Sequence, residues 1–217
     1  KAKISPNPKR PLSYGLNSQL VKQDGELLER VYKSGGLYGA AIDKIIGWLE
    51  KAKAVSENQA QGAALGLLIE YYKTGDMQTW DDYNVAWTSA TDGNIDYINS
   101  FIEVYNDPAG YRGSYETVVQ IKDFEMSQKM AVLSENAQWF EDNSPLMQEH
   151  KKANVVGVTY KVVDVAGEAG DASPSTPIGV NLPNANWIRA AVGSKSVSLG
   201  NIIGAYNNAG GSYDITK

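Results

Sequence analysis

The alternation of apolar and polar side chains over residues 94–107 predicts a strand with two chemically different faces. Pro108 follows and disfavours continuation of a central strand, because it has no N–H to donate. Side chains two positions apart share a face, so Glu103 and Tyr105 should project together, as in the wall of a cleft. Pattern alone nevertheless favours a plainer interpretation, a half-buried sheet with a polar and aromatic outer face. The apolar face carries Ile98, Ser100, Ile102 and Val104, and the opposite face carries Tyr97, Asn99, Phe101, Glu103 and Tyr105.

Upstream of this strand, the pattern predicts a hairpin followed by three helices. Asp24 and Gly25 form a favoured tight-turn pair between apolar runs within residues 13–32. Apolar residues then recur every three or four positions, and Ser56 is the expected cap of the second helix. These apolar stripes need no functional explanation, because they are most simply buried in a core. The three helices cover residues 37–54, 56–73 and 77–87.

Downstream, residues 117–143 give the longest helical signal, which Ser144 and Pro145 end. A valine-rich strand, a loop of small and polar residues and a short extended segment follow. The last two regular segments fit either a strand or a helix. In chain order these five segments cover residues 154–165, 166–177, 178–182, 194–199 and 202–206.

Composition excludes several classes of function. The chain has 217 residues, enough for one sizeable core or two small ones, and its 42% hydrophobic and 21% charged residues are ordinary for a globular protein. A net charge of −5 argues against nucleic acid as a partner. No apolar run is long enough to span a bilayer, so we expect no membrane partner. The absence of cysteine rules out disulfides and thiolate metal sites and fits a reducing compartment, so we expect a cytoplasmic location.

The residue types that usually carry catalysis are sparse. The single histidine, His150, stands in a charged run, whereas a catalytic zinc commonly takes two or three His ligands or a mixture of His and carboxylates. No Gly-x-Ser-x-Gly elbow occurs, and residues 193–196 resemble the tail of a phosphate-binding loop without its upstream glycine. Residue chemistry alone therefore identifies no metal site and no catalytic centre.

A second stretch of interest covers residues 177–184. Asn181 and Asn184 offer amide donors and acceptors, and Gly179 allows another backbone to approach closely. A short extended segment between prolines suits the addition of a peptide strand through main-chain hydrogen bonds. The same features suit an edge strand that its prolines protect from aggregation, and the two interpretations are compatible.

Four segments, taken together and in this order, resemble the dipeptidyl peptidase III family, zinc-dependent exopeptidases that remove dipeptides from the N-terminus of short peptides. The similarity runs from about residue 37 onward and is strongest after Tyr97. No single segment is specific, but the combination is. The segments are 101–108 (F-I-E-V-Y-N-D-P), 112–116 (R-G-S-Y-E), 179–184 (G-V-N-L-P-N) and 197–201 (V-S-L-G-N).

The resemblance implies a role for each residue of a candidate site. Glu103 would hold the substrate's free ammonium group by charge-assisted hydrogen bonds. Tyr105, the implied catalytic residue, would hydrogen-bond the scissile carbonyl or its oxyanion. Two amides would grip the substrate's N-terminal end, a glycine would mark the strand along which the peptide lies, and a further acid would lie near the site. These implied substrate-binding residues are Asn181, Asn184, Gly179 and Glu116.

The sequence departs from the family in one respect that matters for activity. The family's zinc motif, His-Glu-x-x-x-His, and its later glutamate ligand are absent. We therefore expect a fragment of a metallo-exopeptidase, with zinc in the parent protein and none bound by this chain. Its partners would be an oligopeptide substrate and the remainder of the parent, the zinc lobe. Without a metal-activated water, the isolated chain should not hydrolyse peptides.

The implied fold is α+β, with a curved, mainly antiparallel sheet or partial barrel flanked by helices and one long helix. Residues 1–119 would form helices and the start of the substrate-binding lobe. Residues 120–152 would form the long helix leading to the missing zinc lobe, and residues 153–217 would return to the substrate-binding β core. Two other functions stay open from the sequence: a non-catalytic peptide-binding module that uses the same cleft, and a purely structural domain.

Overall fold

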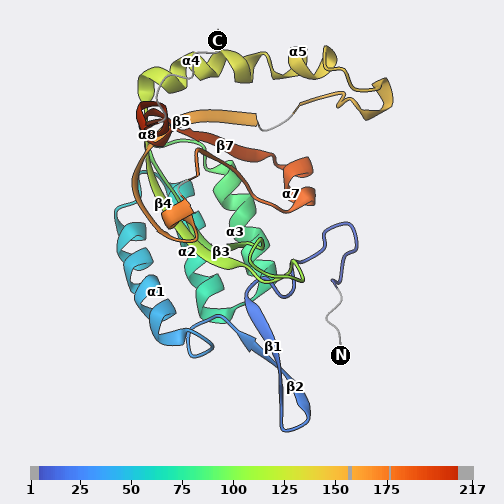
Figure 1. The fold of residues 1–217 in the computed structure, drawn as a ribbon, viewed down its shortest axis with the longest axis vertical. Coiled ribbons are helices and arrows are strands. Elements are labelled where there is room, and N and C mark those ends of the chain that lie inside the picture. The colour runs from blue at the N-terminus through green and yellow to red at the C-terminus, as the bar shows by residue number, and fades with distance from the viewer. Residues whose placement is uncertain (1–4, 156–157, 176, 210–217) are drawn as a thin grey trace.

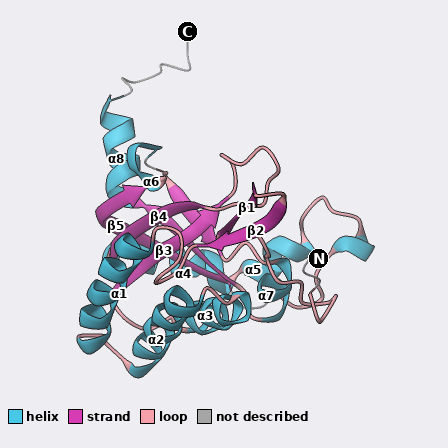
Figure 2. Cartoon of the chain, turned by 90° about the horizontal axis from the view of Figure 1, so that it is seen from below, coloured by secondary structure: helices cyan, strands magenta, loops and turns pink. Residues whose placement is uncertain are grey.

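The chain folds into a five-stranded sheet covered by helices, with a separate two-stranded hairpin (Figures 1 and 2). A computed structural model describes residues 5–155, 158–175 and 177–209 of this arrangement. Helices and strands are mixed along the chain, which confirms the predicted α+β class. The strands are β1 (Ser18–Gln23), β2 (Glu26–Val31), β3 (Ile95–Glu103), β4 (Ser114–Lys122), β5 (Val158–Gly170), β6 (Gly179–Leu182) and β7 (Ser194–Leu199). The helices are α1 (Gly39–Ala54), α2 (Gln59–Thr74), α3 (Met77–Ser89), α4 (Phe124–Glu135), α5 (Ala137–Asp142), the 3-10 turn η1 (Gln148–His150), α6 (Ala172–Ser175), α7 (Asn186–Ala191) and α8 (Gly200–Ala209).

The large sheet has the strand order β3-β4-β5-β7-β6. Neighbouring strands run antiparallel except β5 and β7, which are parallel, so the sheet is mainly antiparallel as predicted. Figure 1 shows helices α4 and α5 across one end of the molecule and the β1–β2 hairpin at the other end. β3 and β6 are the two edges of the sheet, which is not closed into a barrel in the part of the chain described. Each of these edge strands therefore has one side that no other described strand pairs with.

The N-terminal half follows the predicted order of elements. β1 and β2 are joined by a two-residue turn at Asp24 and Gly25, whose φ angles of 52° and 84° are both positive, as a type I′ turn requires. Helices α1, α2 and α3 form where the apolar spacing places them. The cap of α2 is Asn58 rather than Ser56, because a capping residue must directly precede the helix. The Asn58 side chain accepts a hydrogen bond from the Gln61 N–H.

The main core lies between the helices of the N-terminal half and the sheet. Figure 2 shows α1, α2 and α3 together on one side of the strands. Leu68, Tyr71 and Tyr72 of α2 are fully buried. The Tyr71 ring lies 5.0 Å from the ring of Trp80 in α3, and aromatic pairs at this spacing stabilise a core beyond the area they bury. The apolar stripes of α2 and α3 are therefore core, as predicted, whereas the predicted stripe of α1 includes Trp48, which is 69% exposed.

The helix predicted over residues 117–143 begins later than expected. Residues up to the end of β4 are extended, because they pair with β3 on one side and with β5 on the other. The β-branched run from Thr117 favours this extended state. Helix α4 begins after Asp123, whose side chain accepts a hydrogen bond from the Met126 N–H. Residues 124–142 form two helices in place of the single long helix expected there, since α4 and α5 are separate and meet at Asn136.

Several other boundaries differ from the prediction. β5 continues through residues 166–170, which were expected to form a loop, because these residues pair with β4. Residues 194–199 form β7, and residues 202–206 lie in α8. β3 ends at Glu103 after an irregularity in its pairing with β4, so Tyr105 lies beyond the strand. Helix α7 was not predicted.

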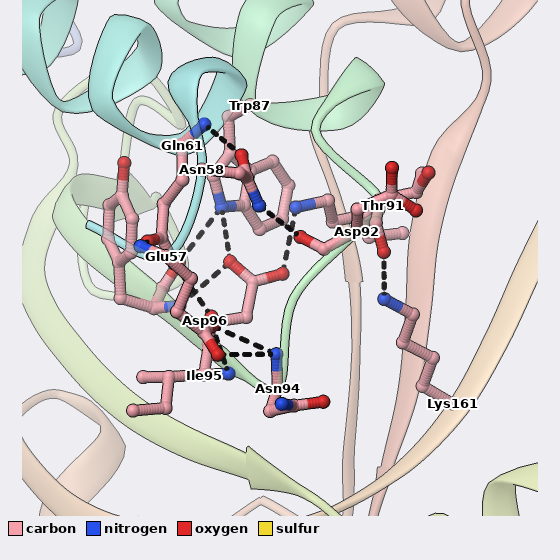
Figure 3. A network of polar contacts seen from close by, with 12 residues as sticks. Glu57, Asn58, Gln61, Trp87, Thr91, Asp92, Asn94, Ile95, Asp96 and Lys161 are labelled. Carbon is pink, nitrogen blue, oxygen red and sulfur yellow. Dashed lines mark hydrogen bonds and ion pairs between the residues drawn. The ribbon is translucent and has the colours of Figure 1, made fainter.

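The beginning of β3 is fixed by polar contacts with the start of α2 (Figure 3). The Glu57 carboxylate, just before the helix, accepts hydrogen bonds from the N–H groups of Asn94 at 2.9 Å and Ile95 at 2.8 Å. The Gln61 side chain donates to the carbonyl of Ile95 at 2.8 Å. These bonds satisfy backbone groups at the start of the strand and hold it against the helix.

A buried ion pair continues this network. Lys195 on β7 is only 6% exposed, and its ammonium lies 2.8 Å from the Asp96 carboxylate and 4.2 Å from the centre of the Trp87 ring. The Asp96 carboxylate also accepts a hydrogen bond from Trp87 Nε1 at 3.0 Å (Figure 3). Burial lowers the pKa of Lys195, and the charge of Asp96 opposes that shift. The pair joins β7 to β3, the strand whose other end carries Glu103.

Candidate functional site

One cleft of about 380 Å³ lies between the two edge strands of the large sheet. It is lined by residues of β3, β4 and β6 and of the segments that follow the strands. All six residues proposed from the sequence line this cleft, although they come from three different strands and their loops. The residues are Glu103, Tyr105, Glu116, Gly179, Asn181 and Asn184.

Glu103 and Asn184 connect the two edges of the sheet directly. The side-chain amide of Asn184 donates a hydrogen bond of 3.2 Å to Glu103 Oε1. Glu103 is half-buried and Asn184 is exposed, so the pair is open to the cleft. A carboxylate offers about four lone-pair positions, so one amide donor leaves Glu103 with the capacity to accept further hydrogen bonds.

Tyr105 lies on the rim of the cleft and is 83% exposed. Tyr105 belongs to a turn, because β3 ends at Glu103 and does not reach Tyr105 as predicted. The Asp107 carboxylate holds this turn by accepting hydrogen bonds from the N–H groups of Tyr111 at 2.9 Å and Arg112 at 3.0 Å. The negative charge of Glu103 is the main cause of the raised pKa of the Tyr105 hydroxyl. The hydroxyl therefore keeps its proton at neutral pH and is available as a hydrogen-bond donor.

Glu116 and Asp171 add two carboxylates to that of Glu103 in the wall of the cleft. Burial, followed by the nearby charges of Glu103 and Asp171, raises the pKa of Glu116 to about 7. Three acids in one cleft repel one another, and a bound cation would relieve that repulsion. The electrostatics of the cleft therefore favour a positively charged ligand.

Asp171 was not among the residues proposed from the sequence. It follows Gly170, whose φ of 70° suits glycine and where a Cβ would overlap the backbone oxygen of Tyr115. The Asp171 N–H donates to that oxygen at 2.8 Å, and the Asn106 side chain donates to the Asp171 carboxylate at 3.0 Å. The Gly-Asp pair is visible in the sequence, but only the pairing of β5 with β4 brings it to the cleft.

We expect the stability of the folded chain to fall as the pH rises from about 4.5 to about 7. In this range the Glu116 carboxyl loses its proton in the unfolded chain but keeps it in the folded chain, because burial makes the folded pKa the higher one. The contribution of Glu116 is complete below 4.5 and is lost as the pH rises through about 7. Thermal melts should show this fall in the wild-type chain and a smaller fall in Glu116→Gln.

A matched control for this experiment is Glu70→Gln, which changes an exposed glutamate on α2. The control should reproduce the wild-type dependence on pH. If the melting temperature of Glu116→Gln depends on pH as that of the wild-type chain does, the pKa of Glu116 is not raised in the folded chain.

The donors in the cleft do not match those of a catalytic zinc site. The described residues contain no group of three His, Cys, Asp or Glu side chains that could hold a metal ion. The cleft presents carboxylates and amides, whereas catalytic zinc sites commonly include His ligands, and His150 lies exposed in η1. Across the same described residues, no helix has the length and apolar character needed to cross a membrane.

Known protein sequences are similar to this chain over most of its length. The sequence profile of peptidase family M49 matches residues 16–215. Dipeptidyl peptidase 3 of Homo sapiens is 31% identical over 168 residues, and that of Nematostella vectensis is 30% identical over 172 residues. These alignments cover 77% and 79% of this chain but only 22% and 23% of the two relatives. The chain thus spans less than a quarter of the length of either relative.

Two solved structures resemble the fold. The structure of DPP III from Caldithrix abyssi matches with a TM-score of 0.79 and 26% sequence identity, over 90% of this chain and 37% of that chain. Dipeptidyl-peptidase III from Corallococcus sp. strain EGB matches with a TM-score of 0.74 and 24% identity, over 88% of this chain and 35% of that chain. The fold described above therefore recurs as a part of larger proteins.

Proposed function

The chain belongs to peptidase family M49, and from this premise we propose that it forms the substrate-binding part of a zinc-dependent dipeptidyl peptidase. The parent enzyme would release dipeptides from the N-terminus of oligopeptides. The zinc ion and its ligands would come from the remainder of the parent, because the described residues do not fit a zinc site. By itself this chain would bind peptides without cleaving them.

The observation that carries the proposal is the acidic cleft between β3 and β6. A free peptide N-terminus is an ammonium group with a positive charge and three N–H donors. Glu103, Glu116 and Asp171 line one cleft, and the amide oxygens of Asn181 and Asn184 add neutral acceptors. Charge-assisted hydrogen bonds to such a group are roughly twice as strong as neutral ones. We therefore assign recognition of the N-terminus to this cleft, with Glu103 as the main acceptor.

The edge strand β6 supports an extended pose for the peptide. Among the described strands β6 pairs with β7 alone, so an added strand would pair with the N–H and C=O groups on its other side. Gly179 and Asn181 belong to β6 and line the cleft. A peptide along this strand, with its N-terminus at Glu103, would pass Tyr105 on the rim. There the protonated hydroxyl would donate a hydrogen bond to a peptide carbonyl, as electrostatic stabilisation of the reaction requires.

Isothermal titration calorimetry with a tetrapeptide and its N-acetylated form tests the proposal. We expect the free-amine peptide to bind at least about tenfold more tightly. Hydrogen bonds to charged groups contribute about 1.5–3 kcal/mol, and about 1.4 kcal/mol corresponds to a factor of ten. A tetrapeptide with an amidated C-terminus is the control and should bind like the unmodified peptide. Equal binding of the free and acetylated peptides would remove the role proposed for Glu103, and no binding of either would favour a purely structural domain.

A further inference from the structure

The turn after β3 presents Tyr105 to the cleft without burying it. The side chain is 83% exposed, so packing against neighbouring side chains does little to fix its position. The Asp107 N–H donates to the Val104 carbonyl at 3.0 Å, which closes the turn on itself. The orientation of Tyr105 relative to the cleft therefore depends on contacts that its neighbours in the turn make with the rest of the fold.

Asn106, the residue directly after Tyr105, makes such contacts. Its side-chain amide donates to Asp171 Oδ1 at 3.0 Å and to Ser114 Oγ at 3.3 Å. Asp171 lies 65 positions further along the chain and directly follows β5, whereas Ser114 is the first residue of β4. One exposed amide thus joins the turn that carries Tyr105 to the start of one strand and the end of another.

The backbone on both sides of Asp171 is fixed. Gly170 has a φ of 70° and lies against the backbone oxygen of Tyr115, which also accepts the Asp171 N–H at 2.8 Å. The next residue, Ala172, is only 2% exposed and belongs to the main core. The Asp171 carboxylate is therefore attached to a well-packed part of the fold, whereas Asn106 belongs to an exposed turn.

We propose that Asp171 is a positioning residue, which acts through Asn106 to hold the Tyr105 hydroxyl where it can donate to a carbonyl of the bound peptide. This inference rests on the proposed function, which gives Tyr105 its role as a donor. Under it, Asp171 contributes a fixed acceptor in addition to the negative charge that it adds to the cleft. A reacting group that is displaced by about 1 Å can lose roughly 100-fold in rate, so a contact that fixes an exposed donor bears directly on turnover in the parent enzyme.

Two substitutions of Asp171 separate this role from a role of its charge alone. Asp171→Asn removes the charge but keeps an oxygen that can accept the hydrogen bond from Asn106, whereas Asp171→Ala removes both the charge and the acceptor. If Asp171 positions Tyr105, the Asn variant should retain the order of the turn and the Ala variant should lose it. If only the charge matters, the two variants should behave alike.

Nuclear magnetic resonance relaxation of the free chain tests the order of the turn without any ligand. We expect backbone order parameters of about 0.85 for Tyr105 and Asn106 in the wild-type chain and in Asp171→Asn, and below about 0.6 in Asp171→Ala. The matched control is Asp82→Ala on α3, which breaks a hydrogen bond of the same kind and length, 3.0 Å from Gln78 Nε2 to Asp82 Oδ1. The control should keep the wild-type values, and unchanged values in Asp171→Ala would overturn the proposal.

Calorimetry with a free-amine tetrapeptide tests whether the order of the turn affects Tyr105. In the wild-type chain, Tyr105→Phe should weaken binding about fivefold, as expected for the loss of one neutral hydrogen bond. The same substitution should have almost no effect in Asp171→Ala and should again cost about fivefold in Asp171→Asn. An equal effect of Tyr105→Phe in the wild-type chain and in Asp171→Ala would contradict the proposal.

Exchange of the two partners provides a rescue experiment. Asn106→Asp alone places two carboxylates side by side and should lower the order parameters of the turn. In the double variant with Asp171→Asn, the amide and the carboxylate exchange places, so the hydrogen bond can form in the opposite direction. The double variant should recover the wild-type order and the effect of Tyr105→Phe. Equal disorder in the single and double variants would count against the proposed contact.

The free and N-acetylated tetrapeptides separate a failure of this inference from a failure of the proposed function. If the order parameters do not change in Asp171→Ala while the wild-type chain still prefers the free-amine peptide, the inference fails and the proposed function stands. If the wild-type chain binds both peptides equally, the proposed recognition of the N-terminus fails, and the inference that rests on it fails with it.

Discussion

Replacing Glu103 by Gln is expected to weaken binding of a free-amine tetrapeptide by about 30-fold, because hydrogen bonds to charged groups contribute about 1.5–3 kcal/mol. The substitution keeps the size of the side chain and an oxygen that can accept the Asn184 amide, which now donates at 3.2 Å. It removes the negative charge and replaces one acceptor oxygen by an NH₂ donor. Glu116 and Asp171 remain in the cleft and should preserve part of the affinity. Calorimetry at constant pH and ionic strength measures the change.

Two comparisons make this result specific to the N-terminus. The N-acetylated peptide should bind Glu103→Gln and the wild-type chain equally, because it carries no ammonium group. Glu70→Gln, which removes an exposed charge from α2, should leave the affinity for both peptides unchanged. An equal loss of affinity for the free and acetylated peptides in Glu103→Gln would show that Glu103 supports the cleft without reading the charge.

Replacing Lys195 by Met should lower the free energy of unfolding by about 3 kcal/mol, since removing one partner of a buried ion pair leaves the other charge without compensation. The Lys195 ammonium is buried 2.8 Å from Asp96, and the partner side chain is 25% exposed, which places the expected loss at the lower end of the range for such pairs. Urea unfolding with unchanged m-values measures the loss. The double variant with Asp96→Asn should recover part of it.

Lys73→Met is the matched control for this stability experiment. It breaks a pair of similar length, 3.2 Å to Glu50, whose side chains are 48% and 54% exposed. Exposed pairs contribute about 0–1 kcal/mol, so this variant should remain close to the wild type. If Lys195→Met and Lys73→Met lower the free energy of unfolding by the same small amount, the buried pair does not anchor β3.

The elements with local signals could be predicted from the sequence. The Asp24-Gly25 turn follows from the preference of those two residues for positive φ, and helices α1 to α3 follow from apolar residues on one face. The resemblance to dipeptidyl peptidases is confirmed by the family match over residues 16–215. It also named six residues that lie around one cleft in the folded chain. Their individual roles stay predictions.

β4 could not be predicted, because its apolar residues fit two periods. Val118 and Ile121 are three positions apart, as on one face of a helix. In the strand Val118 is buried, whereas Val119 and Ile121 are exposed. Apolar side chains therefore lie on both faces, and the sequence lacks the alternation of apolar and polar residues that would mark a strand. Pairing with β5, which lies far along the chain, decides between the two periods.

The same dependence on distant pairing explains the parts of the site that were missed. Asp171 reaches the cleft because Gly170 pairs with Glu116 at the end of the β4–β5 ladder. A neighbouring cavity of about 260 Å³ is lined by both Trp80 of α3 and Leu182 of β6, two residues whose proximity no local pattern encodes. Motifs whose residues are close in the sequence could therefore be recognised from it, whereas the shape of the cleft depends on contacts between distant segments of the fold.

The most direct test of whether Glu103 binds the peptide's N-terminus is a crystal structure of the chain with a bound tetrapeptide. Recognition of the N-terminus by Glu103 predicts that the peptide's N-terminal nitrogen lies about 2.7–3.2 Å from an oxygen of Glu103, with the peptide backbone extended beside β6. A peptide bound with its N-terminus in solvent, or on a surface away from the Glu103 and Asn184 pair, would contradict it.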